Sequence, residues 1–286
     1  MLRRTLALAL AALPVIAAPA LAVEKTGRAE ALILSTAFGF YEGIALSILL
    51  AENDLFPDGD DALVAGAGLT LLTTGATFGA AWWVTEKYGV NEAQARLVTS
   101  SFFWTMLNGG MLSSGVDFDF EDTLWTTLVS GWTGQALGVL LATNVDRTPG
   151  QVGLMNTVAT WSGAEALVIM GAFEIDTDKG YFTVPTLVAD IGLLAGAWLA
   201  SRTPISDSRA RLLDLGALAG GLAGPAALFL AWGPEENMQN WYLSAVAVGI
   251  PAGIATAWYL TRDWDAGKAA ERSSQPLMVP LALGVF

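Results

Sequence analysis

The chain has 286 residues, of which 53% are hydrophobic and 14% are charged, and its mean hydropathy is +0.50. Because soluble domains carry about a quarter charged residues, this balance favours a membrane protein. The absence of cysteine and histidine excludes disulfides, thiol chemistry, imidazole bases and the common zinc and haem ligands, and a net charge of −13 argues against a nucleic-acid partner.

Residues 1–22 have the pattern of a secretory signal peptide. Arg3 and Arg4 form a charged start, an apolar core follows, and residues 20–22 have the small-x-small pattern of a cleavage site. The segment is also short for a membrane span. We therefore expect an exported protein whose mature chain begins near Val23, with an uncleaved membrane anchor as the alternative.

Eight apolar segments of about 20 residues follow, which is the length that a helix needs to cross a bilayer. Short polar connections separate them, so consecutive helices are expected to run antiparallel as four helical hairpins. A transmembrane β-barrel would need strands of about ten residues with apolar and polar alternation, which these segments lack. The sequence thus predicts an all-α membrane domain over 23–265 and a C-terminal tail over 266–286. The predicted helices are 29–51, 62–85, 93–115, 123–143, 151–173, 181–201, 209–232 and 240–262.

The four hairpins resemble one another, which indicates an internal repeat of about 58 residues. Its copies cover 26–90, 91–147, 148–206 and 207–262. Each helix carries two small residues four positions apart, and such small-xxx-small (GxxxG-type) faces let helices approach closely in a bilayer. In the second helices these pairs recur at nearly constant spacing. The pairs are Gly75/Gly79, Gly134/Gly138, Gly192/Gly196 and Gly249/Gly253 in the second helices, and Gly39/Gly43, Thr105/Gly109, Ser162/Ala166 and Gly220/Gly224 in the first helices.

The two ends of the predicted helix bundle differ in charge. Basic residues gather at the end that holds both mature termini, here called side A, whereas the connections at the opposite end, side B, are acidic. In an inner membrane the basic side faces the cytoplasm, but a signal peptide delivers the start of the first helix to the other side. We expect a cell-envelope membrane, and prefer the outer to the inner one because Phe286 resembles the terminal aromatic residue of outer-membrane strands.

Three carboxylates lie near the middle of predicted helices: Glu42, Glu165 and Asp190. Glu42, Asn108 and Glu165 share one repeat position, at which the fourth repeat has Ala223. A charge at the bilayer centre costs about 2.5–3.5 kcal/mol on insertion scales, so a proton, a cation or a hydrogen-bonding neighbour must compensate it. These residues therefore predict either a proton or cation path or a set of hydrogen bonds that fix the register of the helices.

A carboxylate pair could in principle serve acid/base chemistry, but nothing in the sequence identifies a substrate. There is no histidine base for an intramembrane serine protease, and no G-x-x-x-x-G-K-[ST] phosphate-binding loop. We expect a non-enzymatic, multi-pass protein of a bacterial-type cell envelope with a structural or assembly role and without a cofactor or metal. The alternative is a proton- or cation-linked channel or transporter that uses the mid-membrane carboxylates.

The expected partners are the lipid bilayer and, through the glycine faces, a second copy of the chain. The acidic connections at side B are expected to form a solvated anionic face, with weak binding of divalent cations as the alternative. These connections are 52–61, 117–122, 174–180 and 234–237.

Overall fold

The computed structural model describes residues 26–53, 55, 60–116, 118–175, 181–233 and 238–265. Within these ranges the protein consists of eight α-helices and has no strand, so the prediction of an all-α fold is confirmed. The predicted signal peptide, Phe286 and half of the acidic residues in the side-B connections lie outside the described residues. The helices are α2 (Arg28–Glu52), α3 (Asp60–Tyr88), α4 (Glu92–Gly115), α5 (Phe120–Asn144), α6 (Pro149–Ala172), α7 (Thr183–Arg202), α8 (Asp207–Trp232) and α9 (Gln239–Leu260).

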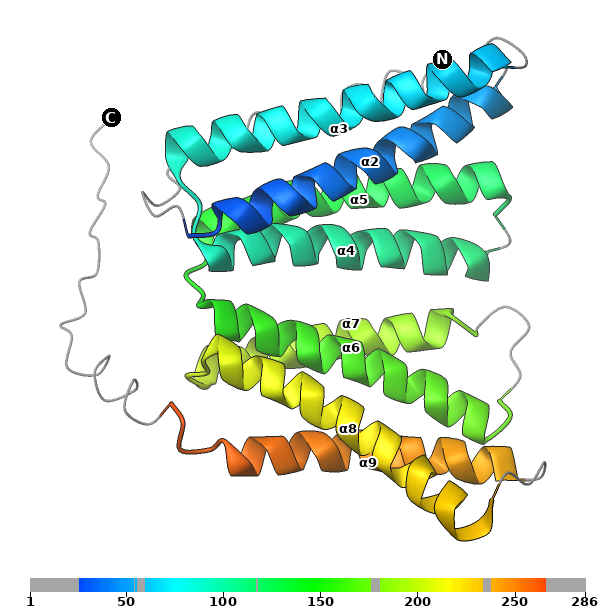
Figure 1. The fold of residues 1–286 in the computed structure, drawn as a ribbon, viewed down its shortest axis with the longest axis vertical. Helices are drawn as coiled ribbons and strands as arrows, with labels where there is room; N and C mark the ends of the chain where they lie inside the picture. The colour runs from blue at the N-terminus through cyan, green and yellow to red at the C-terminus, as the bar shows by residue number, and fades with distance from the viewer. Residues whose placement is uncertain are drawn as a thin grey trace, which may run out of the picture.

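Consecutive helices pair as four hairpins, as the short connections predict. The most extensive helix contacts are those of α2 with α3, α4 with α5, α6 with α7 and α8 with α9. Between hairpins, α2 contacts α4 and α5, α4 contacts α6 and α7, and α6 contacts α8 and α9. Figure 1 shows the resulting arrangement, in which the hairpins follow one another along the longest axis of the molecule. The fold is an open row of four hairpins in chain order.

The first helices of the hairpins start at capping residues in corresponding repeat positions. Asn91 caps α4 and Thr148 caps α6, each in a capping box with the glutamine at the third helical position. These glutamines, Gln94 and Gln151, also donate from Nε2 to backbone carbonyl oxygens near the ends of α5 and α7, at 3.1 and 2.7 Å. One side chain thus starts the first helix and holds the end of the second beside it.

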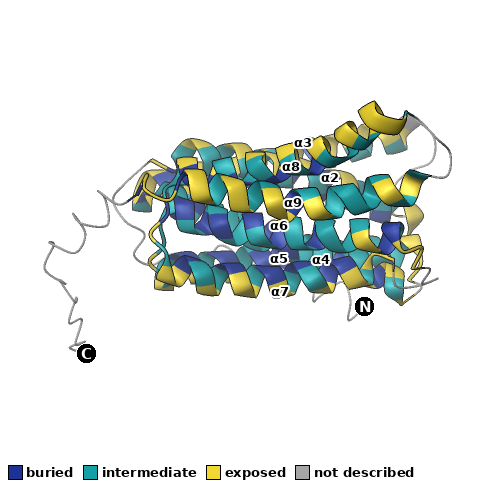
Figure 2. Cartoon of the chain, turned by 90° about the horizontal axis from the view of Figure 1, so that it is seen from below, coloured by how far each residue is buried: buried dark blue, intermediate teal, exposed yellow. Residues whose placement is uncertain are grey.

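Five helices, α2, α3, α7, α8 and α9, are long and apolar enough to cross a membrane. The other three, α4, α5 and α6, lie in the middle of the row and carry polar side chains that form contacts between hairpins, among them Asn108, Gln135 and Asn156. Figure 2 shows exposed residues along α3 and α9 and buried ones on the central helices. The exposed residues include large hydrophobic ones such as Leu71, Leu194 and Leu230. An apolar surface of this extent is typical of contact with lipid.

Glycines lie at the contact between the two helices of each hairpin. A Cβ atom added at Gly134 would overlap Thr105 and the backbone of Ser101, on the neighbouring helix α4. At Gly249 and Gly220 the added atom would overlap the backbone of the partner helix. Helices can approach this closely only where the contact carries no bulky side chain. The other predicted packing glycines at which an added Cβ atom would lie under 3.0 Å from the partner helix are Gly39, Gly43, Gly109, Gly138, Gly192, Gly196, Gly224 and Gly253.

Six of these glycines do not meet the small-residue pair of the partner helix, and Gly43, Gly138 and Gly196 are three of the six. An added Cβ atom at each of these three would overlap the backbone of a residue that carries an ordinary side chain. The two small-residue pairs of a hairpin are therefore staggered along the helices, and glycine on one side alone is sufficient for close approach there. Gly43, Gly138 and Gly196 lie against the Cα atoms of Thr70, Val98 and Met155, respectively.

The first hairpin differs further from the predicted glycine pattern. Nothing lies within 4 Å of a Cβ atom added at Gly75 or Gly79, so this pair does not face α2. The α3 residue that faces Gly39 is Thr77. Thr77 thus takes the place that Gly134 has in the second hairpin, opposite the first small residue of the first helix. The prediction that Gly75 and Gly79 pack against α2 was therefore wrong. It aligned the glycines of α3 with those of α5, whereas α3 contacts α2 through threonines.

Candidate functional site

Glu42 is buried between the first and second hairpins. Its residue is 7% exposed, and its Oε1 accepts hydrogen bonds from Trp132 Nε1 and Gln135 Nε2 of α5, both at 3.1 Å. Leu49 and Leu128 pack in the same region. Two hydrogen-bond donors on the next hairpin therefore compensate the cost of burying this carboxylate.

Asp190 and Asn108 form the corresponding contact between the second and third hairpins. Asn108 Nδ2 donates to Asp190 Oδ1 at 2.8 Å and to the carbonyl oxygen of Trp104 at 2.9 Å. Asn108 occupies the repeat position of Glu42, and Asp190 occupies that of Trp132. The same two repeat positions are thus in contact at both interfaces. At the first interface the acid is on the first helix of the earlier hairpin, and at the second it is on the second helix of the later hairpin.

Glu165 occupies the first-helix position at the third interface, but it has no polar partner in the described part of the chain. The residue that corresponds to Asp190 in the fourth repeat is Ala247, and a methyl group cannot donate a hydrogen bond. Glu165 is half-buried. Of the three predicted carboxylates, two are paired and one is not, and each lies at a different interface, so the structure does not bring them into one site.

A second series of polar contacts links the first helices of consecutive hairpins. Trp104 Nε1 donates to Asn156 Oδ1 at 3.1 Å, and Trp161 Nε1 donates to Asp214 Oδ1 at 3.0 Å. Trp161 and Asp214 stand one repeat after Trp104 and Asn156. This series was not predicted, although its spacing matches the repeat. The tryptophans would have stood out in an alignment of the four repeats.

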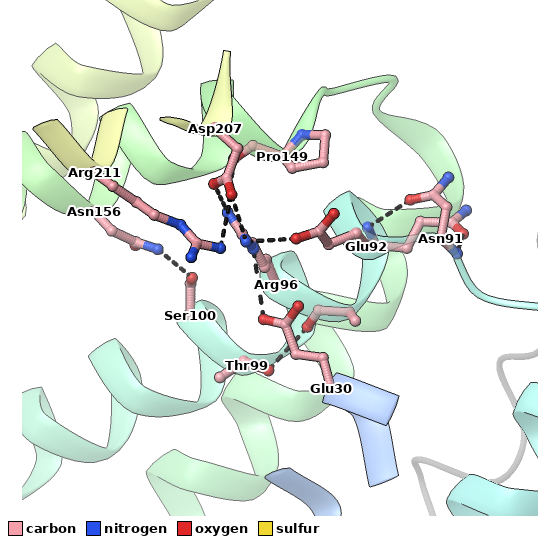
Figure 3. Close-up of polar contacts among 12 residues, drawn as sticks. Glu30, Asn91, Glu92, Arg96, Thr99, Ser100, Pro149, Asn156, Asp207 and Arg211 are labelled. Carbon is pink, nitrogen blue, oxygen red and sulfur yellow. Dashed lines mark hydrogen bonds and ion pairs between the residues drawn. The ribbon is translucent and has the colours of Figure 1, made fainter. Parts of the chain in front are cut away.

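Charged residues at side A connect the first, second and fourth hairpins. Arg96 of α4 forms ion pairs with Asp207, with Glu92 at 2.6 Å and with Glu30 at 3.6 Å, and Arg211 pairs with Asp207 at 2.7 Å. Figure 3 shows these five residues, the Arg96 cluster, with the guanidinium of Arg96 between the three carboxylates. The cluster was not predicted, because Arg96 and Asp207 lie 111 positions apart in the sequence.

A polar cavity of about 300 Å³ lies beside the Arg96 cluster, with walls from α2, α4, α6 and α8. Gly153 lines it at the repeat position that carries Arg96 in the second repeat and Arg211 in the fourth. A Cβ atom added at Gly153 would lie 2.9 Å from the Cβ atom of Ala210 on α8. The glycine therefore lets α6 and α8 approach closely beside the cavity.

Replacing Arg96 by methionine should destabilise the protein by about 2 kcal/mol, since hydrogen bonds to charged groups contribute about 1.5–3 kcal/mol and three carboxylates would lose their shared cation. The free energy of unfolding in mixed micelles measures this effect. Arg262→Met is the matched control, because Arg262 and its partner Asp263 are both exposed and such pairs contribute about 0–1 kcal/mol. Equal losses in the two variants would show that the Arg96 cluster does not connect the hairpins.

The side-B connections also form hydrogen bonds between hairpins. Asn53 donates to Glu121 at 3.1 Å, and Asn240 donates to Glu174 at 2.8 Å. In the ranges that the structure describes, no three acidic side chains are placed so that they could hold a metal ion. Searches with this chain against protein families, curated proteins and solved structures gave no match.

Proposed function

We propose that the protein is a non-enzymatic scaffold of a cell-envelope membrane, with all eight helices across the bilayer and a structural or assembly role. The observation that supports this function most is the distribution of the polar residues between hairpins. Glu42 with Trp132, Asn108 with Asp190, and Trp161 with Asp214 each join a different pair of neighbouring hairpins. A transport path needs polar groups that converge on one route, whereas these contacts are distributed over the three interfaces of the row.

Such contacts serve a scaffold in a membrane. Lipid provides little hydrophobic drive for helix association, so packing and interhelical hydrogen bonds, of about 0.6–2 kcal/mol each, decide which helices meet and in what register. Repeating these bonds at every interface gives a stiff row of hairpins. The broad apolar surface on either side of the row then remains available to lipid and to other membrane proteins.

Reconstitution into vesicles tests this function. We expect no movement of H⁺, Na⁺ or K⁺ above that of empty vesicles. In cells lacking the protein we expect loss of envelope integrity, measured as sensitivity to detergent. Integrity should be restored by the parent chain and by Glu165→Gln, but not by Gly134→Leu. Ion flux that Glu165→Gln abolishes would contradict the scaffold function.

The unpaired carboxylate of Glu165 favours a second candidate, a proton- or cation-linked path. Unlike Glu42 and Asp190, this group has no described donor, and an ionisable residue within a membrane commonly marks an ion pathway. For this candidate, flux in vesicles should be lost in Glu165→Gln and retained in Glu42→Gln, whose carboxylate is already paired. Equal flux in both variants would exclude Glu165 as the site.

We further propose that the signal peptide over 1–22 exports the chain, and that the outer membrane is its destination in preference to the inner. Fractionation combined with N-terminal sequencing tests both parts. We expect a mature chain that begins near Val23 in the outer-membrane fraction. An intact N-terminus, or an inner-membrane protein with side A in the cytoplasm, would contradict the proposal.

A further inference from the structure

The last hairpin exposes a face that is an interface elsewhere in the chain. On α6, Trp161 points to the fourth hairpin, where it donates to Asp214, and Thr157 is 3% exposed. Their counterparts on α8, one repeat later, are Ala219 and Leu215. Ala219 is exposed and Leu215 is 58% exposed. The face that α6 uses to contact the next hairpin is therefore exposed on α8.

This face of the fourth hairpin is hollowed into an apolar groove of about 780 Å³. Ala219 and Ala223 line it, together with Leu215 and Gly253. The position of Ala219 holds tryptophan in repeats two and three, and the position of Ala223 holds asparagine and glutamate there. Small apolar residues thus replace the large polar ones at the two positions that contact the next hairpin.

The second, third and fourth hairpins each use one face to contact the preceding hairpin. In the first hairpin, which has no preceding one, the corresponding face is exposed. With Thr77 in the place of Gly134, the counterpart of Leu128 on α3 is Leu71. Leu128 is 1% exposed, whereas Leu71 is 74% exposed. Ile33 of α2 stands at the position of Asp214 and is also exposed. Phe78 of α3 is exposed as well and is a large apolar residue like the other two. Large apolar side chains therefore project from this end of the row.

We propose that copies of this chain associate head to tail, with the first hairpin of one copy seated in the groove of the fourth hairpin of another. Ile33 would meet Ala219 as Asp214 meets Trp161 within the chain. The interface continues contacts that already occur between the hairpins of one chain, and large side chains at one end complement small ones at the other.

The proposed contact is heterologous, because two different faces of the chain meet. Such interfaces produce rings when the rotation closes and open rows when it does not. The apolar residues at both end faces are compatible with lipid before association, since no buried donor or carboxylate would be left unpaired there. This inference rests on the proposed scaffold function and names its partner as a second copy of the chain.

Disulfide crosslinking tests this pairing directly, because the chain contains no cysteine. Ile33→Cys and Ala219→Cys variants with different tags are coexpressed and oxidised in native membranes with copper phenanthroline. We expect a disulfide-linked pair that carries both tags, little linkage in either variant alone, and a ladder of multimers from the double variant. Leu194→Cys paired with Ala219→Cys is the matched control, because Leu194 is as exposed as Ile33 but lies outside both end faces.

Absence of the mixed pair, or linkage of Ile33→Cys mainly to itself, would overturn the head-to-tail contact. As a second measurement, Ala219→Trp should fill the groove and shift the protein from multimers to monomers in native mass spectrometry. Ala219 is exposed, so the fold should tolerate this change. Ion flux in vesicles would contradict the scaffold function without affecting the crosslink, and a missing crosslink with no flux would overturn the association while the scaffold function stands.

Discussion

Leucine in place of Gly134 is expected to destabilise the protein by at least about 3 kcal/mol, because overpacking costs about 1–3 kcal/mol or more even when side chains can adjust. A Cβ atom at Gly134 would overlap the side chain of Thr105 and the backbone of Ser101, and backbone cannot move aside without separating α4 from α5. Leucine in place of Gly75 should change the stability by less than about 0.5 kcal/mol, as surface substitutions do. Gly75 faces open space, with nothing within 4 Å of an added Cβ atom.

The measurement is unfolding in mixed micelles of increasing SDS content, followed by circular dichroism. Gly79→Leu is a second neutral control, since its surroundings are also open, and Gly249→Leu should repeat the large loss. Equal losses at Gly75 and Gly134 would show that α3 packs on α2 through its glycines, and that the threonine contact with Gly39 is not formed.

Glu42→Ala is expected to cost about 2–4 kcal/mol, because it leaves the buried donors of Trp132 and Gln135 without an acceptor and adds a cavity. Glu42→Gln should cost less than about 1 kcal/mol, since glutamine keeps the shape and one acceptor oxygen. If Glu42 fixes the register of the helices, its acceptor oxygen matters and glutamine can replace it. If Glu42 carries ions, its charge matters and glutamine cannot replace it.

A double-mutant cycle with Trp132→Phe isolates the contact between Glu42 and the indole. We expect a coupling of about 0.6–2 kcal/mol, the range found for interhelical hydrogen bonds in membranes. Glu165→Ala is the matched control at the equivalent position, and should cost less than about 0.5 kcal/mol because no described partner is lost. Additive effects in the cycle, or a Glu42→Gln variant as unstable as Glu42→Ala, would contradict the register role.

The helices and their pairing were predictable because a bilayer imposes a long apolar run on each helix and short connections force neighbours together. The observed bounds differ from the predicted ones by only a few residues at each end. The register of α3 was not predictable from glycines alone, since α3 contacts α2 through Thr73 and Thr77. Threonine can be small enough to pack closely while it also donates a hydrogen bond, and a search for glycines overlooks it.

Contacts between hairpins were harder to predict than the hairpins themselves. Asn108 was recognised as a member of the carboxylate series, but its partner depends on which faces of successive hairpins meet. The Arg96 cluster shows the same limit. The pairs of Glu92 with Arg96 and of Asp207 with Arg211 follow from helical spacing, but the link between Arg96 and Asp207 crosses α6 and requires the three-dimensional order of the row.

In the proposed scaffold all four hairpins cross the membrane in a row, including α4, α5 and α6, which are not among the five helices long and apolar enough by themselves to do so. Single cysteines in a chain that has none allow every connection to be assigned to one side with an impermeant maleimide. We predict that cysteines at Lys87, Asp146 and Thr203 react from one side of the membrane only, and that cysteines at Asn53, Phe118 and Ile175 react only from the other. Lys87, Asp146 and Phe118 are exposed. Labelling of Phe118→Cys from the same side as Lys87→Cys would show that α4 and α5 do not cross the bilayer, and would contradict the proposed arrangement.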